Sequence, residues 1–246
     1  MSTEKIIKKQ ARLALRGNWS VMIAAVAVVC TVLILIEALF YFFCFFSGIV
    51  NVNTGAVVKF LLILNISPLI NGVVRLFCNA SLGKDADIFE LFYFFRSAKR
   101  YLKTLLVNFV LMLIYSVLSY AFDAYFYASQ ALNADLIRDF NFNLITLALV
   151  GAFLATVIIK AAVFLLFAYY PTIAYSFNDS LPARRYMFGF IGFSFRHFAE
   201  SAKLVLSLVG WIVFSCLLVV PVIYTLPYAG VSAATSAKWL FSLYKL

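Results

Sequence analysis

Charged side chains are scarce in this sequence. Only 12% of its 246 residues are Asp, Glu, Lys or Arg, whereas 65% are hydrophobic. About a quarter of the residues in a soluble globular domain are charged, so this composition excludes that class. At roughly 20 residues per membrane-spanning helix, the length allows about six spans with short connections. The sequence therefore predicts an all-α, polytopic transmembrane helical bundle that forms a single domain, 1–246.

Residues that enzymes and metal sites commonly use are also scarce. His197 is the only histidine, and Glu200, its one carboxylate neighbour at ligand spacing, makes a very weak metal signal. The chain has no P-loop, no GxSxG, no HExxH and no pair of acidic motifs. Four isolated cysteines stand in apolar segments without a CxxC pair, which is typical of small core residues: Cys30, Cys44, Cys78 and Cys216. We therefore expect no enzymatic activity, no cofactor and no metal.

Cations outnumber anions, because 20 Lys and Arg residues face 10 Asp and Glu residues and give a net charge of +10. Nucleic-acid-binding proteins share such an excess. Here, however, the cations gather beside apolar runs rather than in a soluble basic module, as in membrane proteins whose orientation is set by charge. We expect the lipid bilayer, and not nucleic acid, to be the partner of this charge.

Three segments place cations on one face of a predicted surface helix, each just before an apolar run. The central segment is 89–103, in which four cations fall at helical spacings and oppose an apolar face: Arg96, Lys99, Arg100 and Lys103. We predict that 89–103 is one helix lying flat on the membrane and that these four cations contact anionic lipid headgroups. The N-terminal segment 1–19 is a second basic amphipathic helix, and 183–203 is the third. Alternatively, these cations only set the orientation of the spans in the membrane and bind no particular lipid.

Six apolar segments are predicted to span the membrane: 21–46, 56–80, 103–127, 146–177, 203–220 and 222–244. Lys and Arg gather in the N-terminal segment and in the second and fourth loops, so the positive-inside rule predicts that both termini are cytoplasmic. An offset of 100 residues superposes Phe95-Arg96 on Phe195-Arg196 and Lys103 on Lys203. Together with a proline in every second span, this offset is consistent with a three-unit repeat of surface helix and two spans.

Polar residues inside predicted spans are costly and therefore mark candidate functional positions. Glu37 and Lys160 both lie about 25 Å from the predicted cytoplasmic side, and we predict that they form a pair. In the second span, Asn71 and Arg75 share a face with Pro68, and we expect that face to look into the protein. Glu37, Asn71, Arg75 and Lys160 together form a candidate intramembrane polar site.

Several short patterns occur together along the chain: Ala11-Arg12 followed by Arg16-Gly17-Asn18-Trp19; Pro68-Leu69 with Gly72 and Arg75, then Asp87-Ile88-Phe89; Gly210-Trp211; and Leu226-Pro227-Tyr228 ahead of Ala233 and Phe241. This combination resembles a bacterial family of six-span integral membrane proteins, domain-of-unknown-function family 975. The resemblance covers nearly the full length and departs after Pro182 and in the long fourth span. It implies six spans in a bacterial plasma membrane, and it implies no mechanism.

Two classes of function follow from these features. The first is a non-enzymatic membrane scaffold or lipid-interacting module that uses the basic segments. The alternative is a small transporter or exporter component that uses the intramembrane polar site. A water-accessible pathway between the spans favours the transporter, whereas a solid core with paired polar groups favours the scaffold.

Overall fold

A computed structural model of the chain describes residues 3–47, 52–138, 142–218 and 222–243, and these residues contain helices and no strand. Four helical segments are long and apolar enough to cross a membrane: Trp19–Phe46, Val57–Ser81, Ala98–Tyr120 and Leu154–Phe177. The all-α prediction is confirmed, and these four segments are compatible with a multi-pass membrane protein. The predicted spans 203–220 and 222–244 lie partly outside the described residues, so six spans stay a prediction.

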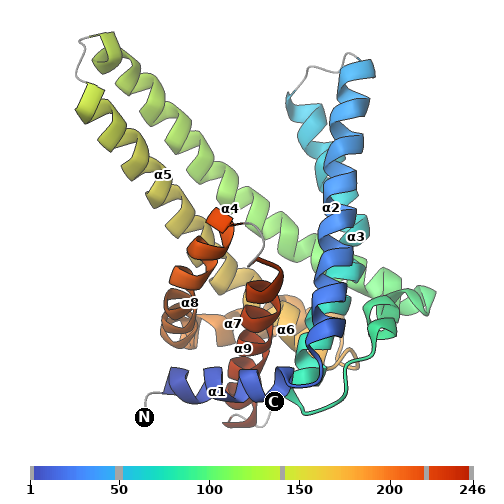
Figure 1. The fold of residues 1–246 in the computed structure, drawn as a ribbon. Coiled ribbons are helices and arrows are strands. Elements are labelled where there is room, and N and C mark those ends of the chain that lie inside the picture. Colours follow the sequence, from blue (N-terminus) through green and yellow to red (C-terminus); the bar gives the residue numbers. More distant parts are fainter. Residues whose placement is uncertain (1–2, 48–51, 139–141, 219–221, 244–246) are drawn as a thin grey trace.

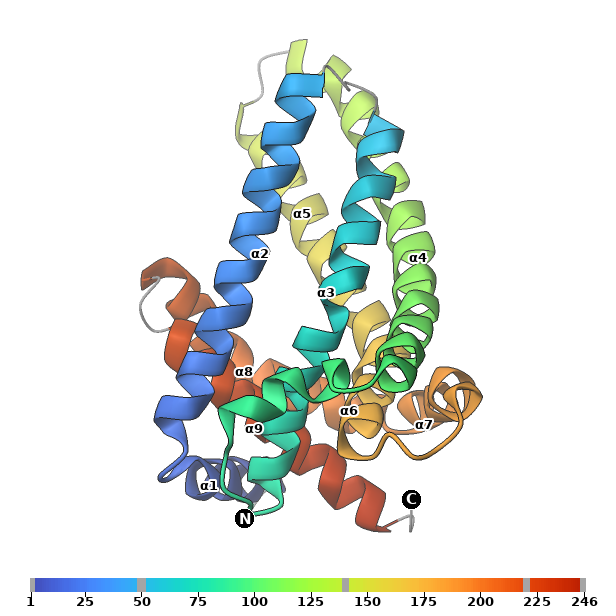
Figure 2. The same cartoon turned by 90° about the vertical axis from the view of Figure 1, so that its right-hand side faces the viewer.

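The helices form three pairs, and a short helical segment precedes each pair (Figures 1 and 2). In the first unit, α1 (Thr3–Leu15) precedes α2 (Trp19–Ser47) and α3 (Val52–Ser81). In the second, η1 (Ile88–Phe95) precedes α4 (Ala98–Arg138) and α5 (Phe142–Phe164), which continues through η2 (Leu165–Tyr169) into α6 (Tyr170–Phe177). In the third, η3 (Arg185–Gly189) and α7 (Phe190–Arg196) precede α8 (Phe198–Leu218) and α9 (Val222–Leu243).

Helix α1 and the C-terminal end of α9 lie at the same end of the molecule, which we call the base (Figure 1). The second helix of each pair lies centrally, because α3 packs against both α6 and α9, which also touch each other. Each short helical segment packs on the central helix of the preceding unit: η1 on α3, η3 and α7 on α6, and α1 on α9. Since α1 belongs to the first unit and α9 to the third, this packing closes the three units into a ring.

Helix α4 extends beyond the predicted span 103–127 at both ends, because it runs from Ala98 to Arg138. No glycine or proline interrupts this stretch, so nothing in its local sequence ends the helix earlier. Its 41 residues make about 60 Å of helix, twice the hydrocarbon thickness of about 30 Å. In the view of Figure 1, α4 and α5 lean away from α2 and α3.

A π-helical turn interrupts the long helix formed by α5 and α6. Pro171 has no backbone N–H, and its ring displaces the carbonyl group four residues earlier, at Phe167. The π turn Leu165–Tyr169 lies at that position and widens the helix there.

The segment 89–103 is not one helix, and that prediction was wrong. It consists of the 3₁₀ helix η1, a turn at Arg96 and Ser97, and the first turns of α4. Asp87 caps η1, because its side chain accepts a hydrogen bond from the backbone N–H of Phe89 at 3.0 Å. The third basic segment, 183–203, is also divided, since the helix is broken at His197 between α7 and α8.

The three-residue period of η1 gives it three distinct faces. One face, Leu91 and Phe94, is fully buried in the core. A second face carries only exposed phenylalanines, with exposed fractions of 67%, 47% and 43% for Phe89, Phe92 and Phe95. The third face carries Glu90 and Tyr93, and both contact arginines. We call the second face the phenylalanine face.

A glycine lets η1 lie directly on α3. A Cβ atom added to Gly72 would lie 2.0 Å from the carbonyl oxygen of Leu91 and 2.7 Å from its carbonyl carbon. These atoms belong to the backbone, so no change of side-chain rotamer relieves the overlap. Gly72 therefore permits a backbone-to-backbone contact between α3 and η1.

We expect the Gly72→Ala variant to be less stable than the wild type by about 1 to 3 kcal/mol, because the added methyl group pushes η1 off α3. Thermal or denaturant unfolding in detergent micelles measures the effect. The matched control is Gly210→Ala in α8, where an added Cβ meets nothing within 4 Å. Equal stability of the two variants would contradict the proposed role of Gly72.

Candidate functional site

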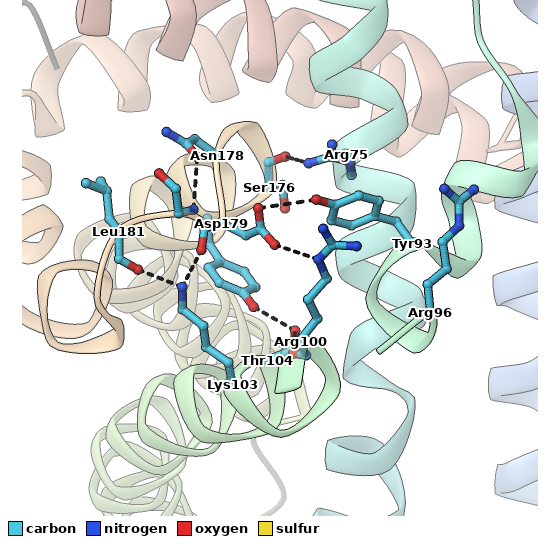
Figure 3. Close-up of polar contacts among 12 residues, drawn as sticks. Arg75, Tyr93, Arg96, Arg100, Lys103, Thr104, Ser176, Asn178, Asp179 and Leu181 are labelled. Atoms are coloured by element: carbon cyan, nitrogen blue, oxygen red, sulfur yellow. Dashed lines mark hydrogen bonds and ion pairs between the residues drawn. The ribbon is translucent and has the colours of Figure 1, made fainter. Parts of the chain in front are cut away.

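Charged and aromatic side chains from α3, η1, α4 and the loop after α6 meet beside η1 (Figure 3). We call this group the η1 cluster. Its members are Arg75, Glu90, Tyr93, Arg96, Arg100, Lys103 and Asp179. Three ion pairs and three cation–π contacts to the ring of Tyr93 connect its members.

Arg75 projects from α3 and is bound by three partners. Its Nε donates to Glu90 Oε2 at 2.8 Å, and its Nη1 donates to the carbonyl oxygen of Ser176 at 3.2 Å. Its guanidinium lies over the ring of Tyr93, 3.6 Å from the centroid. The side chains of Arg75 and Glu90 are only 17% and 21% exposed, so removing either partner leaves a charge that is poorly solvated. Arg75 thus ties α3 to both η1 and α6.

Tyr93 collects cations around its ring and binds an anion with its hydroxyl group. The guanidinium groups of Arg100 and Arg96 lie 4.5 Å and 5.9 Å from its ring centroid, in addition to that of Arg75. These distances fall within the roughly 6 Å range of cation–π attraction. The hydroxyl group donates to Asp179 Oδ1 at 3.3 Å, and Asp179 Oδ2 lies 3.4 Å from Arg100 Nε.

Two side chains hold the loop that carries Asp179. Lys103 Nζ donates to the carbonyl oxygens of Asp179 and Leu181, the latter at 2.6 Å. The hydroxyl group of Tyr186 donates to the carbonyl oxygen of Asn178 and accepts from the N–H of Leu181 at 3.1 Å. Burial raises the pKa of Tyr186 to about 12, so this hydroxyl group keeps its proton at neutral pH.

A stack of aromatic rings supports the cluster from the core. The fully buried ring of Tyr175 stacks on Phe94, with centroids 5.2 Å apart, and meets the edge of Tyr186 at 5.0 Å. Its hydroxyl group shares a hydrogen bond of 2.8 Å with Thr104 Oγ1. These contacts fix η1, α4, α6 and η3 relative to one another, and so they position the charged groups above them.

Three of the four predicted lipid-contacting cations bind groups of the protein itself. Arg96 Nη2 donates to the carbonyl oxygen of Phe89 at 3.2 Å, and its Nη1 lies 3.8 Å from Glu90 Oε1. Arg100 and Lys103 hold Asp179 as described above. Lys99 is exposed, and within the described residues it makes no hydrogen bond or ion pair. It is therefore the cation of the four that is most available to an external anion.

The predicted interior polar site is divided between at least two places. Asn71 and Arg75 come together at Ser176, whose Oγ donates to the carbonyl oxygen of Asn71 at 3.4 Å. Asn71 Nδ2 also donates to Asn108 Oδ1, at 3.5 Å. These contacts place Asn71 next to Arg75, at the edge of the η1 cluster.

Glu37 pairs with Lys59 of α3 at 2.7 Å and not with Lys160 of α5, as we had predicted. The reason is geometric, because α2 and α3 form an antiparallel hairpin that brings Glu37 and Lys59 to the same height. Lys59 and Arg75 are 16 residues apart on α3, or about 24 Å along the helix. The Glu37 pair and the η1 cluster are therefore separate.

Sequence reasoning missed Lys59, Glu90, Tyr93 and Asp179. The sequence pattern pointed to Glu90 and Tyr93, because Glu90, Tyr93 and Arg96 are spaced three residues apart, which is the period of a 3₁₀ helix. It also pointed to Lys59, because Glu37 precedes the polar segment between the first two predicted spans and Lys59 follows it. Asp179 carried no local signal, since only the tertiary fold brings its loop to α4.

No metal-ligand group of three or more His, Cys, Asp or Glu side chains occurs among the described residues. Comparisons with family models, curated proteins and solved structures found no match for the chain. The resemblance to family 975 therefore stays a prediction, and the arguments about function rest on the geometry of the η1 cluster.

We expect a double-mutant cycle of Arg75→Gln and Glu90→Gln to show a coupling of about 1 to 3 kcal/mol, because each single change leaves one poorly solvated charge unpaired. Unfolding in detergent measures it. The matched cycle of Arg96→Gln and Glu90→Gln should give less than about 1 kcal/mol, since that pair is longer and Arg96 is 48% exposed. Equal coupling in both cycles would show that Arg75 has no special role.

Proposed function

We propose that the protein is a non-enzymatic, multi-pass membrane protein that binds anionic lipid headgroups beside η1 and acts as a lipid-interacting scaffold. The observation that carries this proposal is one short element, η1, with an exposed phenylalanine face next to a cluster with excess positive charge.

The first point is the charge balance of the site. The cations are Arg75, Arg96, Lys99, Arg100 and Lys103, and the carboxylates that they contact are Glu90 and Asp179. Asp87, which caps η1, is a third carboxylate at this site. Three carboxylates do not neutralise five cations, so two positive charges remain. Near an anionic leaflet, each such charge contributes about 1 kcal/mol of attraction.

The second point is the phenylalanine face. Phe89, Phe92 and Phe95 lie on one side of η1, and each of them keeps a large exposed fraction even though Phe95 packs against Tyr101. Neighbouring exposed apolar side chains mark a surface that meets a membrane or a partner. A membrane interface suits both the aromatic face and the cations beside it, because the rings enter the acyl boundary while the cations stay at the headgroups.

The third point is orientation. Five Lys and Arg residues belong to or directly follow α1 at the base: Lys5, Lys8, Lys9, Arg12 and Arg16. Under the positive-inside rule, the base then faces the cytoplasm, where anionic lipids attract cations. On this reading both termini are cytoplasmic, α8 and α9 are the fifth and sixth spans, and the membrane is the bacterial plasma membrane that the family resemblance implies.

A threefold internal repeat belongs to the same proposal. The ring of packing contacts supports it, because each short helical segment meets the central helix of the preceding unit. Each central helix also carries a proline: Pro68 in α3, Pro171 in α6 and Pro227 in α9.

The transporter alternative has less support, since the four polar residues proposed for it do not meet at one site.

We expect Lys99→Gln to weaken binding of phosphatidylglycerol roughly fivefold, which corresponds to the loss of one cation at about 1 kcal/mol. The measurement is the thermal stabilisation of the detergent-purified protein as lipid is titrated, with phosphatidylcholine as the neutral comparison. Lys84→Gln is the matched control, because Lys84 is also an exposed cation but lies on the loop before η1 and not next to Arg100 in α4. Equal effects of both variants, or no preference for the anionic lipid, would overturn the proposal.

We expect a cysteine at Ser180 to be protected from a membrane-impermeant maleimide in intact cells and labelled after lysis. Ser180 is exposed on the loop that carries Asp179, and the proposed orientation puts this loop in the cytoplasm. The variant is made in a background without the four natural cysteines, and a cysteine at Asn51, which lies between α2 and α3 in the sequence, is the outward control. Labelling of Ser180→Cys in intact cells would show that this loop faces outward and would contradict the proposed orientation.

A further inference from the structure

A cavity of about 500 Å³ lies inside the helix bundle. Helices α2, α3, α8 and α9 line it, together with the helix that runs from α5 through η2 to α6. Its volume falls within the range of small-molecule sites, about 300 to 1,000 Å³. The η1 cluster does not contribute to its wall, so this cavity is separate from the site proposed above.

The wall of the cavity offers almost nothing to a polar ligand. Among its lining residues, only Tyr169 and Thr172 carry hydroxyl groups, Cys30 carries a thiol, and none is charged. The hydroxyl group of Tyr169 already donates to the carbonyl oxygen of Ala233 at 3.3 Å. Water needs two to four polar partners to occupy a site, and an empty apolar cavity loses dispersion contacts along its whole lining. The wall therefore selects an apolar occupant.

The lining of the cavity follows three of the helices for about two turns each, at 26–33 in α2, 70–77 in α3 and 226–234 in α9. Two turns correspond to about 10 Å. Helices that cross a bilayer run roughly parallel to its acyl chains, so an acyl chain that enters from the side meets this apolar lining along several of its methylene groups.

The cavity opens to the surface of the bundle. Two of its lining residues, Phe164 and Leu226, are 47% and 40% exposed. Both stand on long helices, and Phe164 lies within the candidate span Leu154–Phe177. At that depth the surrounding medium is hydrocarbon, so a lipid chain reaches the opening from the side without passing through water.

We propose that this cavity binds one acyl chain of a membrane phospholipid, inserted laterally between the helices. The cavity recognises the acyl chain by apolar contact, and the lipid headgroup does not affect which lipid binds. This site is independent of the headgroup site beside η1, so either assignment can fail without the other.

The test is photolabelling of the full-length protein in vesicles of phosphatidylcholine that carries a diazirine in one acyl chain. We expect cross-links to concentrate in 26–33, 70–77 and 226–234. Val205→Phe, which fills the cavity from α8, should reduce these cross-links several-fold. The matched control is Leu206→Phe on the same helix, because Leu206 is 71% exposed and does not line the cavity, and it should leave them unchanged. Ala229→Leu is a milder filling variant in case Val205→Phe does not fold.

Cross-links spread evenly over exposed positions such as Ile34 and Leu206 would overturn the proposal, as would equal labelling of the folded filling variant and the wild type. Lys99→Gln should not change this labelling, because the probe lipid is zwitterionic and the cavity holds no charge. A loss of labelling in Lys99→Gln would assign the bound lipid to the η1 site instead.

Discussion

The arrangement of the η1 cluster depends on one contact between two backbones. Helix α3 carries only a hydrogen atom where the carbonyl group of Leu91 crosses it, and this lets η1 lie on α3. Because η1 then has a fixed position and a period of three, its buried face enters the core, its polar face meets Arg75, and its phenylalanine face points outward. A side chain at Gly72 moves all three faces together, so the core and the charged site share one steric constraint.

The charges of the cluster illustrate how a membrane protein keeps cations near apolar surroundings. An unpaired charge there is costly, and Arg75 avoids that cost through Glu90, a backbone carbonyl and the ring of Tyr93. Arg100 and Lys103 use Asp179 and its loop in the same way. The internal carboxylate partners are fewer than the cations, which leaves a net positive surface. One set of contacts therefore both stabilises the fold and provides the charge on which the proposed binding of anionic lipid depends.

Composition and period were sufficient to predict the helical class, the order of short basic segments and long helices, and the inward-facing side of α3 that carries Asn71 and Arg75. They did not predict η1, because an amphipathic α-helix and a 3₁₀ helix followed by a turn place Arg96 and Arg100 at similar spacings. The partner of Glu37 was assigned from depth alone, and depth does not show which helices are neighbours; the hairpin of α2 and α3 decides in favour of Lys59. Asp179 reaches the cluster only through the packing of the loop after α6, which no local pattern encodes.

The ring of three units has a consequence for biosynthesis. Ribosomes deliver helices in chain order, so η1 finds α3 already made, and η3 and α7 find α6 already made. Helix α1 is different, because its main packing partner α9 belongs to the third unit and is made two units later. The face of α1 that carries Ile7, Ala11 and Leu15 therefore meets α9 only after the intervening helices have been made. A bilayer surface shelters such an apolar face in the interval, and the packing of α1 on α9 then closes the ring.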